Sequence, residues 1–209
     1  MTQSKGTALI TGASTGIGAI YADRLAKRGH DLIIVARNRQ RLASLARRLA
    51  GETGRKVEMV EADLTSPADL QRVEDILKTN AGISLLVNNA GIGATAPLVA
   101  SDVDKMEDMI SLNVTALTRL TYAAVPGFVA RGNGLIINIA SIVAIAPEVL
   151  NGVYGGPKAF VLAFSQSLVH ERQGHPGAGG AAGRDRNRIL GYCRHAGAST
   201  SGSDRDVGR

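Results

Sequence analysis

Hydrophobic and polar positions follow one repeating unit from residue 7 to about residue 170. Each unit is a short apolar run, a turn, and a stretch with the apolar spacing of an amphipathic helix. The predicted strands are 7–11, 31–36, 56–61, 84–88 and 135–140, and the predicted helices are one that ends at residue 27 and those over 38–49, 67–79, 102–125 and 154–171. Strands that are apolar on both faces and alternate with helices are typical of a parallel sheet covered on each side. The pattern therefore predicts a three-layer α/β/α fold.

The pattern changes beyond residue 171. Residues 171–209 contain nine Gly, seven Arg, no Lys and no convincing apolar period, and only Arg188–Cys193 is a candidate for a weak structured piece. A segment of this composition has little apolar surface whose burial could offset the entropy lost on ordering. We therefore expect one domain over residues 1–171 and a disordered, non-homologous tail over 172–209.

The composition excludes several classes of protein. A hydrophobic fraction of 44% with 20% charged residues is typical of a soluble globular protein. The longest apolar stretch, 135–147, is too short to span a bilayer, and the N-terminus has no apolar core of a secretory signal. The single Cys193 excludes an internal disulfide and suits a reducing compartment. We expect a cytoplasmic protein that does not bind a membrane and has no metal site.

The net charge of +6 raises the question of a nucleic-acid partner. Half of this charge belongs to residues 171–209, and the patterned part of the chain is only mildly basic. Its Arg residues at 37, 39, 41, 47 and 48 flank one predicted helix, which is typical of a solvated helix face. No aromatic residues are interleaved with them to stack on bases. We expect no nucleic-acid binding.

The turn after the first predicted strand is rich in glycine and reads Thr11-Gly12-Ala13-Ser14-Thr15-Gly16-Ile17-Gly18. Glycines allow the backbone to approach a pyrophosphate, and the N-terminus of the following helix supplies free N–H groups and a favourable dipole. The spacing is Gly-x3-Gly-x-Gly, which differs from the G-x-G-x-x-G fingerprint of other dinucleotide sites. The turn therefore indicates a phosphate-binding loop.

The same turn also matches the G-x-S-x-G nucleophile elbow of hydrolases, with Ser14 as the nucleophile. That elbow follows several strands, whereas this turn follows the first one. The required downstream histidine would have to be His170, His175 or His195, at the end of the last helix or in the unusual tail. A serine hydrolase is the weaker alternative.

Three further motifs occur at the ends of predicted strands or at the start of the last helix. Asn88-Asn89-Ala90-Gly91 ends the fourth strand, Ser141 closes the fifth, and Tyr154-x3-Lys158 opens the last helix. Together with the glycine-rich turn, this ordered set resembles the short-chain dehydrogenase/reductase family over residues 7–171, about four fifths of the chain. The resemblance implies a Rossmann-like sandwich with a mostly parallel sheet of strand order 3-2-1-4-5, and hydride transfer between NADP(H) and a carbonyl or alcohol.

The resemblance also implies the catalytic residues. Tyr154 would be the acid/base, Lys158 would support it and hold the nicotinamide ribose, and Ser141 would steady the substrate oxygen. Asn113 matches the fourth catalytic position, where a water-linked proton relay passes. The chemistry is reasonable because an ammonium one helical turn from a phenol lies on the same face and favours the phenolate. Pro157 is expected in the first turn of the helix, where a missing N–H is tolerated.

The end of the second predicted strand indicates NADP(H) in preference to NAD(H). Ala36 stands where an Asp or Glu usually grips a free 2′-hydroxyl, and Arg37 follows it with a planar fork that suits phosphate oxygens. Asp63-Leu64 resembles the pair that contacts adenine. The full set of implied cofactor-binding residues is Gly12, Ser14, Thr15, Gly16, Ile17, Gly18, Arg37, Asn38, Asp63, Leu64, Asn89, Ala90, Gly91, Tyr154 and Lys158.

The family continues after this helix with a sixth strand, a Pro-Gly turn, a covering loop and a seventh strand, none of which is visible here. Back-translation of residues 172–195 with suitable third bases, read one nucleotide later, permits a sequence containing Ile-Arg-Val-Gln-Ala-Val-Leu-Pro-Gly. We therefore expect that the C-terminal part is a frameshift product and that the later strands are missing. A catalytically impaired NADP(H)-binding remnant is the second alternative. The expected partners are a small carbonyl or alcohol substrate and a second copy of the chain (dimer or tetramer) through the 102–125 and 154–171 helices.

Overall fold

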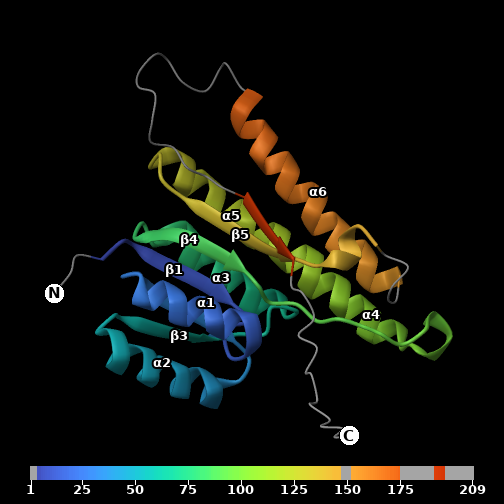
Figure 1. Cartoon of the computed structure of the whole chain (residues 1–209), viewed down its shortest axis with the longest axis horizontal. Helices are drawn as coiled ribbons and strands as arrows, with labels where there is room; N and C mark the ends of the chain where they lie inside the picture. Colours follow the sequence, from blue (N-terminus) through green and yellow to red (C-terminus); the bar gives the residue numbers. More distant parts are fainter. Residues whose placement is uncertain (1–3, 147–151, 175–190, 196–209) are drawn as a thin grey trace, which may run out of the picture.

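The computed structural model describes residues 4–146, 152–174 and 191–195; of residues 170–174 and 191–195 it describes only the backbone. One parallel sheet runs through these residues in the order β3-β2-β1-β4-β5-β6 (Figure 1). Its strands are β1 (Thr7–Thr11), β2 (Asp31–Ala36), β3 (Val57–Glu61), β4 (Ile83–Asn88), β5 (Leu135–Ala140) and β6 (Gly191–His195). The predicted order of the first five strands is confirmed.

Helices cover both faces of the sheet. They are α1 (Gly16–Lys27), α2 (Arg39–Thr53), α3 (Pro67–Thr79), α4 (Val103–Ile110), α5 (Leu117–Ala130) and α6 (Gly152–Gly174), with short 3-10 turns over Leu98–Ala100 and Ile142–Ala144. Successive side chains of a strand point to opposite faces. In β1, Ala8 and Ile10 accordingly pack with α1 and α2, and Leu9 packs with α3 and α5. This explains why the central strands are apolar at nearly every position.

The sixth strand corrects one expectation. Gly191–His195 pairs in parallel with β5, from Ile136 opposite Gly191 to Ala140 opposite His195, so the prediction that no strand follows the fifth is wrong. The physical reason is that the edge of β5 offers unpaired backbone N–H and C=O groups, which an extended segment can satisfy whatever its side chains are. The division of the chain at residue 171 stays a prediction, and the expected disorder at 175–190 and 196–209 lies outside the described residues.

The long helix predicted over 102–125 is divided in three. Between α4 and α5, residues Ser111–Ala116 form a π-helical segment, and the helix continues to Ala130 with Pro126 inside α5. Asp102 caps α4 by accepting hydrogen bonds from the N–H groups of Asp104 (2.9 Å) and Lys105 (3.4 Å). A π-helical turn is rare and often lies at a functional site. Among the described helices, none is long and apolar enough to cross a membrane.

The last helix starts earlier than predicted. It begins at Gly152 instead of Tyr154, so Pro157 lies inside the helix, beyond its first turn. The missing N–H of Pro157 therefore removes an intrahelical hydrogen bond, which the expected position would have avoided. The helix lies on the same side of the sheet as α5, where Val161 packs against Leu117 of α5 and Ala140 of β5.

Candidate active site

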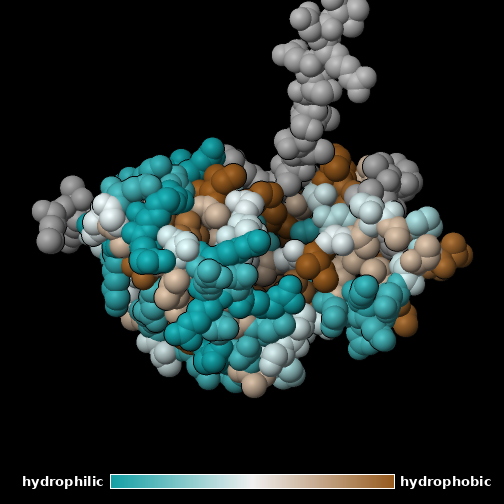
Figure 2. Space-filling view, turned by 90° about the horizontal axis from the view of Figure 1, so that it is seen from below, coloured by the Kyte–Doolittle hydropathy of each residue, from teal (hydrophilic) through white to brown (hydrophobic). Residues whose placement is uncertain are grey.

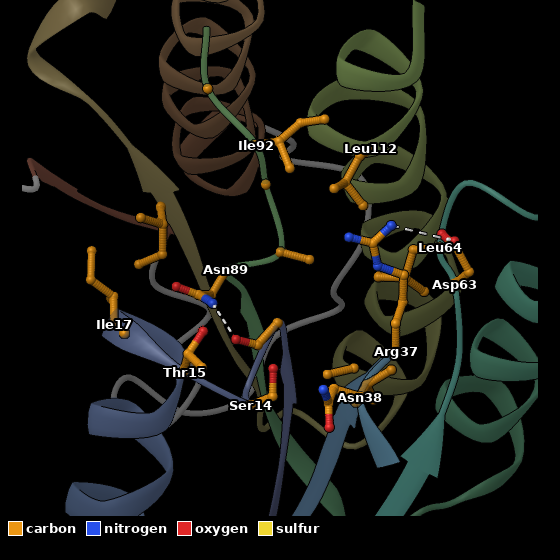
Figure 3. Close-up of a pocket in the computed structure, with 18 of the residues that line it drawn as sticks. Ser14, Thr15, Ile17, Arg37, Asn38, Asp63, Leu64, Asn89, Ile92 and Leu112 are labelled. Atoms are coloured by element: carbon orange, nitrogen blue, oxygen red, sulfur yellow. Dashed lines mark hydrogen bonds and ion pairs between the residues drawn. The ribbon is translucent and has the colours of Figure 1, made fainter. Parts of the chain in front are cut away.

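A cavity of about 910 Å³ opens at the carboxyl ends of the strands. Of the residues predicted to bind the cofactor, all except Gly18 line it, and Ser141 lines it too. Figure 3 shows Ser14, Thr15 and Ile17 on one side of this hollow and Arg37, Asn38 and Asp63 on the other. The lining residues that the sequence argument left out are Val35, Arg41, Ala62, Ile92, Gly93, Leu112, Ile139 and Ala140.

The glycine-rich turn has a backbone that suits a bound pyrophosphate. Gly12 (φ +64°) and Gly16 (φ +56°) have left-handed backbone conformations that residues other than glycine rarely adopt. Thr15 is the N-cap residue of α1, but its side chain accepts no hydrogen bond from the first N–H groups of the helix. The first turn of α1 also holds no acidic residue. Its free N–H groups and positive dipole end therefore fit an anionic phosphate group.

Thr11 joins the turn to the Asn-Asn-Ala-Gly segment. Its hydroxyl donates to the carbonyl of Val87 (3.3 Å) and accepts from the N–H groups of Asn89 and Ala90 (both 3.0 Å). The Asn89 amide donates in return to the carbonyls of Thr11 (2.9 Å) and Gly12 (3.1 Å). Thr11 is not among the site residues predicted from the sequence. Its position as the only hydroxyl residue at the carboxyl end of β1 was the available signal.

Gly18 lies behind the turn. A Cβ atom there would be 2.4 Å from the Gly12 carbonyl oxygen and 2.5 Å from Asn89 Nδ2. Both distances are far below an ordinary contact, so only glycine allows α1 to pack this closely against the turn and Asn89. The role of Gly18 is therefore to bring the helix N-terminus to the cavity.

At the other end of the cavity, Arg37 Nη1 lies 3.6 Å from Asp63 Oδ2, and both side chains are substantially exposed. Burial acts to raise the pKa of Asp63, but hydrogen bonds from Thr65 and the positive charge of Arg37 outweigh it and hold this pKa below its usual value. Asn38 accepts a hydrogen bond from the Arg41 N–H (2.9 Å) and so caps α2. Arg37 thus already faces a carboxylate before any ligand is considered.

Tyr154 and Lys158 lie at the opposite end, near Ser141. The Tyr154 ring packs over the backbone of Gly93, where an added Cβ would be 3.4 Å from Tyr154 Cζ. Lys158 is 8% exposed, and its ammonium donates to the carbonyl of Ile139 (2.8 Å), which lies near the carboxyl end of β5, two residues before Ser141. A phenol, a hydroxyl and an ammonium therefore belong to residues that line the same cavity. Such a group of residues can hold an oxygen atom and move a proton to it.

Asn113 lies in the π-helical segment and is not part of the cavity wall. It is 2% exposed, and its amide bonds both backbone groups of Ile92: Oδ1 accepts from the N–H (3.0 Å) and Nδ2 donates to the carbonyl (2.8 Å). A Cβ on Gly91 would be 2.9 Å from Asn113 Oδ1. Asn113 therefore fixes the segment that follows Gly91, and the predicted proton relay through it stays a prediction.

A buried network of hydrogen-bonded polar side chains connects α5, β4, β5 and α6. It was not predicted from the sequence. Asn88 Nδ2 donates to Thr121 (3.1 Å) and to Asn138 Oδ1 (3.0 Å). Asn138 Nδ2 donates to the Ser165 hydroxyl (2.9 Å), which donates to the carbonyl of Val161 (2.7 Å). Among the side chains that the structure describes, the apolar cluster between α6 and the sheet contains Val161, Phe164, Ala140 and Leu117. This hydrogen-bonded network therefore contributes to the position of the helix that carries the Tyr-x3-Lys pair.

Comparison with known proteins adds to this geometry. The sequence profile of the family described as short chain dehydrogenase matches residues 6–176. Human 17-beta-hydroxysteroid dehydrogenase type 3 is 34% identical over 168 residues, which cover 78% of this chain and 53% of that protein. A very-long-chain 3-oxoacyl-CoA reductase of Pyrenophora tritici-repentis is 34% identical over 174 residues, covering 80% and 51%. The chain spans about half the length of the curated relatives it matches.

Two solved structures are more similar in sequence. A short-chain dehydrogenase from Sphingobium yanoikuyae in complex with NADPH is 52% identical, with a TM-score of 0.78 over 79% of this chain and 65% of that one. The bulky-bulky ketone specific alcohol dehydrogenase from Comamonas testosteroni is 45% identical, with a TM-score of 0.80 over 82% and 69%. Both identities are high enough for the likeness to extend beyond the fold to the family.

Proposed function

The chain belongs to the short-chain dehydrogenase family of oxidoreductases, and we propose that it interconverts a carbonyl and an alcohol with NADP(H). The observation that carries this proposal is that the phosphate-binding turn and the Ser141, Tyr154 and Lys158 side chains line one cavity. A dinucleotide bound along this cavity would extend from the α1 N-terminus towards Tyr154. When bound, NADP(H) supplies or accepts the hydride.

The residues of this chain would contribute binding and proton transfer. The first N–H groups of α1 hold the pyrophosphate, and the Ser141 hydroxyl donates to the substrate oxygen. The Tyr154 hydroxyl gives its proton to that oxygen during reduction and takes it back during oxidation. The buried Lys158 ammonium stabilises the phenolate left by proton donation.

The preference for NADP(H) is supported by charge. No carboxylate stands at the end of β2, where Ala36 lines the cavity, and Arg37 follows. An acid at this position would repel a 2′-phosphate, whereas an Arg can bind its oxygens with two parallel hydrogen bonds. The NADPH complex of the Sphingobium protein is in agreement with this choice.

The substrate class we propose is an uncharged ketone with bulky apolar substituents. Besides Ser141, Tyr154 and Lys158, the cavity lining includes Ile92, Gly93 and Ile139, and Ile142 and Ile145 after Ser141 are 48% and 62% exposed. Figure 2 shows hydrophilic residues over most of the left part of this face, and hydrophobic residues in its centre and at its right end. Two of the similar proteins, a 17-beta-hydroxysteroid dehydrogenase and a bulky-bulky ketone specific alcohol dehydrogenase, support this choice.

The two alternatives make different predictions. A catalytically impaired remnant of such an enzyme would bind NADPH but would reduce no ketone. A hydrolase would need a histidine beside Ser14, but His30, the one histidine whose side chain the structure describes, precedes β2 at the opposite edge of the sheet. Membership of an oxidoreductase family also argues against the hydrolase hypothesis. Hydrolysis of a simple ester by the purified chain, measured with and without NADPH, would test it directly.

The proposal is tested with the purified chain by titrating NADPH and NADH, followed by NADPH oxidation with an alkyl aryl ketone and with acetone. We expect tighter binding of NADPH, oxidation with the bulky ketone and little with acetone. Equal affinities, or tighter binding of NADH, would contradict the cofactor preference. A higher kcat/KM for acetone would contradict the apolar substrate class alone.

A further inference from the structure

Most of the arginines in α2 and just before it already have an acidic partner. Arg39 Nη1 lies 3.7 Å from Glu61 Oε2 and lines a separate surface hollow with Arg72 and Met59. Arg48 pairs with Asp23 and Glu52, both at 3.1 Å. Arg37 lines the large cavity, but its guanidinium faces Asp63, so part of its charge is neutralised.

Arg41 differs from these residues. It lines the large cavity together with Arg37 and Asn38, and its side chain is exposed. Its guanidinium forms no ion pair with any residue that the structure describes. Arg41 is the third residue of α2, and its own N–H is capped by Asn38. The full positive charge of Arg41 is therefore available to a ligand in the cavity, close to the positive end of the α2 dipole.

We propose that Arg41 is a second binding residue for the cofactor 2′-phosphate and a determinant of the preference for NADP(H). The inference rests on the proposed function, because it takes NADP(H) as the ligand of this cavity. A phosphate monoester carries a charge of about −1.5 to −2 near neutral pH. Arg37 alone cannot balance that charge while it faces Asp63, and Arg41 supplies the missing cation on the same wall.

The neighbouring Arg39 provides a matched control. Arg39 and Arg41 are two residues apart on the same helix and carry the same charge, but Arg39 lines the other hollow and pairs with Glu61. NADPH and NADH are a matched pair of ligands, because they differ only in the 2′-phosphate. A general change in net charge or folding would affect both arginine variants alike, whereas loss of a 2′-phosphate contact affects only one variant and one ligand.

The experiment measures the Kd of NADPH and NADH by fluorescence for the full chain and for Arg41→Ala, Arg39→Ala and Arg37→Ala. We expect Arg41→Ala to weaken NADPH by about tenfold, as one charge-assisted contact is lost, with the Kd of NADH unchanged. Arg39→Ala leaves both constants unchanged. Arg41→Lys keeps the charge without the fork, so it weakens NADPH less than Arg41→Ala.

This design distinguishes a failure of the inference about Arg41 from a failure of the proposed cofactor. If Arg41→Ala binds NADPH as tightly as the unmodified chain while Arg37→Ala weakens it, the inference is wrong and the use of NADP(H) stands. If the unmodified chain does not prefer NADPH to NADH, the proposed cofactor is wrong, and the inference is overturned with it. A fall in NADH affinity equal to that for NADPH in Arg41→Ala also overturns the inference, because the 2′-phosphate is then not the group that Arg41 binds.

Discussion

The close approach of α1 to the glycine-rich turn makes Gly18→Ala a sharp test of the site. The added methyl would lie 2.4 Å from the Gly12 carbonyl oxygen and 2.5 Å from Asn89 Nδ2. Relief requires either α1 to move away by roughly 1 Å, towards the usual contact distance, or Asn89 to leave its place. Asn89 would then lose its hydrogen bonds to the carbonyls of Thr11 and Gly12.

The size of the effect on stability follows from these contacts. Overpacking of a tight interior costs about 1–3 kcal/mol, and replacing a helical Gly by Ala returns up to about 1 kcal/mol. Because the added methyl meets backbone and a hydrogen-bonded amide, the cost lies at the upper end of that range, about 2–3 kcal/mol. We therefore expect a net loss of about 1–2 kcal/mol. For a chain of this size that loss corresponds to a fall in Tm of roughly 2–8 °C. The affinity for NADPH should fall by about tenfold or more, because the displaced N–H groups are those that face the phosphates.

Gly51→Ala is the matched control. Gly51 lies in α2, it is exposed, and an added Cβ meets no atom within 4 Å. The same substitution should raise stability there by up to about 0.5–1 kcal/mol and leave the Kd of NADPH unchanged. Thermal unfolding by circular dichroism and NADPH titration measure both effects. The reasoning is refuted if Gly18→Ala matches the unmodified chain in Tm and in NADPH affinity.

Three further predictions concern the helix, the acid beside Arg37 and the C-terminal part. Ser165→Ala leaves the buried Asn138 amide without its acceptor, which should lower the free energy of unfolding by about 1–3 kcal/mol. It should also lower kcat more than it changes the Kd of NADPH. Urea unfolding and steady-state kinetics measure these effects, and an unchanged kcat would contradict a positioning role. Because the pKa of Asp63 is lowered in the folded chain, its carboxylate contributes stability above the usual carboxyl pKa and loses it as the pH falls through the folded value. Asp63→Asn should therefore be less stable than the unmodified chain at neutral pH, with the difference vanishing in acid melting curves; a difference that persists at low pH would contradict this. Restoring the reading frame by one nucleotide near codon 172 should raise both Tm and the rate of NADPH-dependent reduction, and equal values for the two proteins would mean that the tail is native sequence.

The sequence predicted the parts of the molecule that depend on local pattern. The apolar runs gave the first five strands, and the glycine-rich turn and the Tyr-x3-Lys pair lie on one cavity because parallel strands all end at the same edge of the sheet. The pattern could not predict the π-helical turn at Asn113, because its apolar spacing differs little from that of an α-helix.

The remaining differences come from tertiary contacts. Thr11 and Ser165 act through hydrogen bonds to residues 78 and 27 positions away, which no local motif reveals. Strand β6 forms along the backbone edge of β5, so the poor apolar content of Gly191–His195 was a weak guide to its pairing. The charge pattern favours a solvated helix face for Arg41, because the place of this residue on the cavity wall depends on the fold and follows from no local motif.

The most direct test of the account follows the hydride itself. The chain is incubated at stoichiometric concentration with NADPH deuterated at the transferred position and with an alkyl aryl ketone, and the alcohol is analysed by mass spectrometry. The account predicts one deuterium on the carbinol carbon with the unmodified chain and no labelled alcohol with Tyr154→Phe, although that variant binds NADPH with nearly unchanged affinity. Bound NADPH without any labelled alcohol, or equal labelling by Tyr154→Phe, would contradict the proposal that this cavity carries out carbonyl reduction through Tyr154.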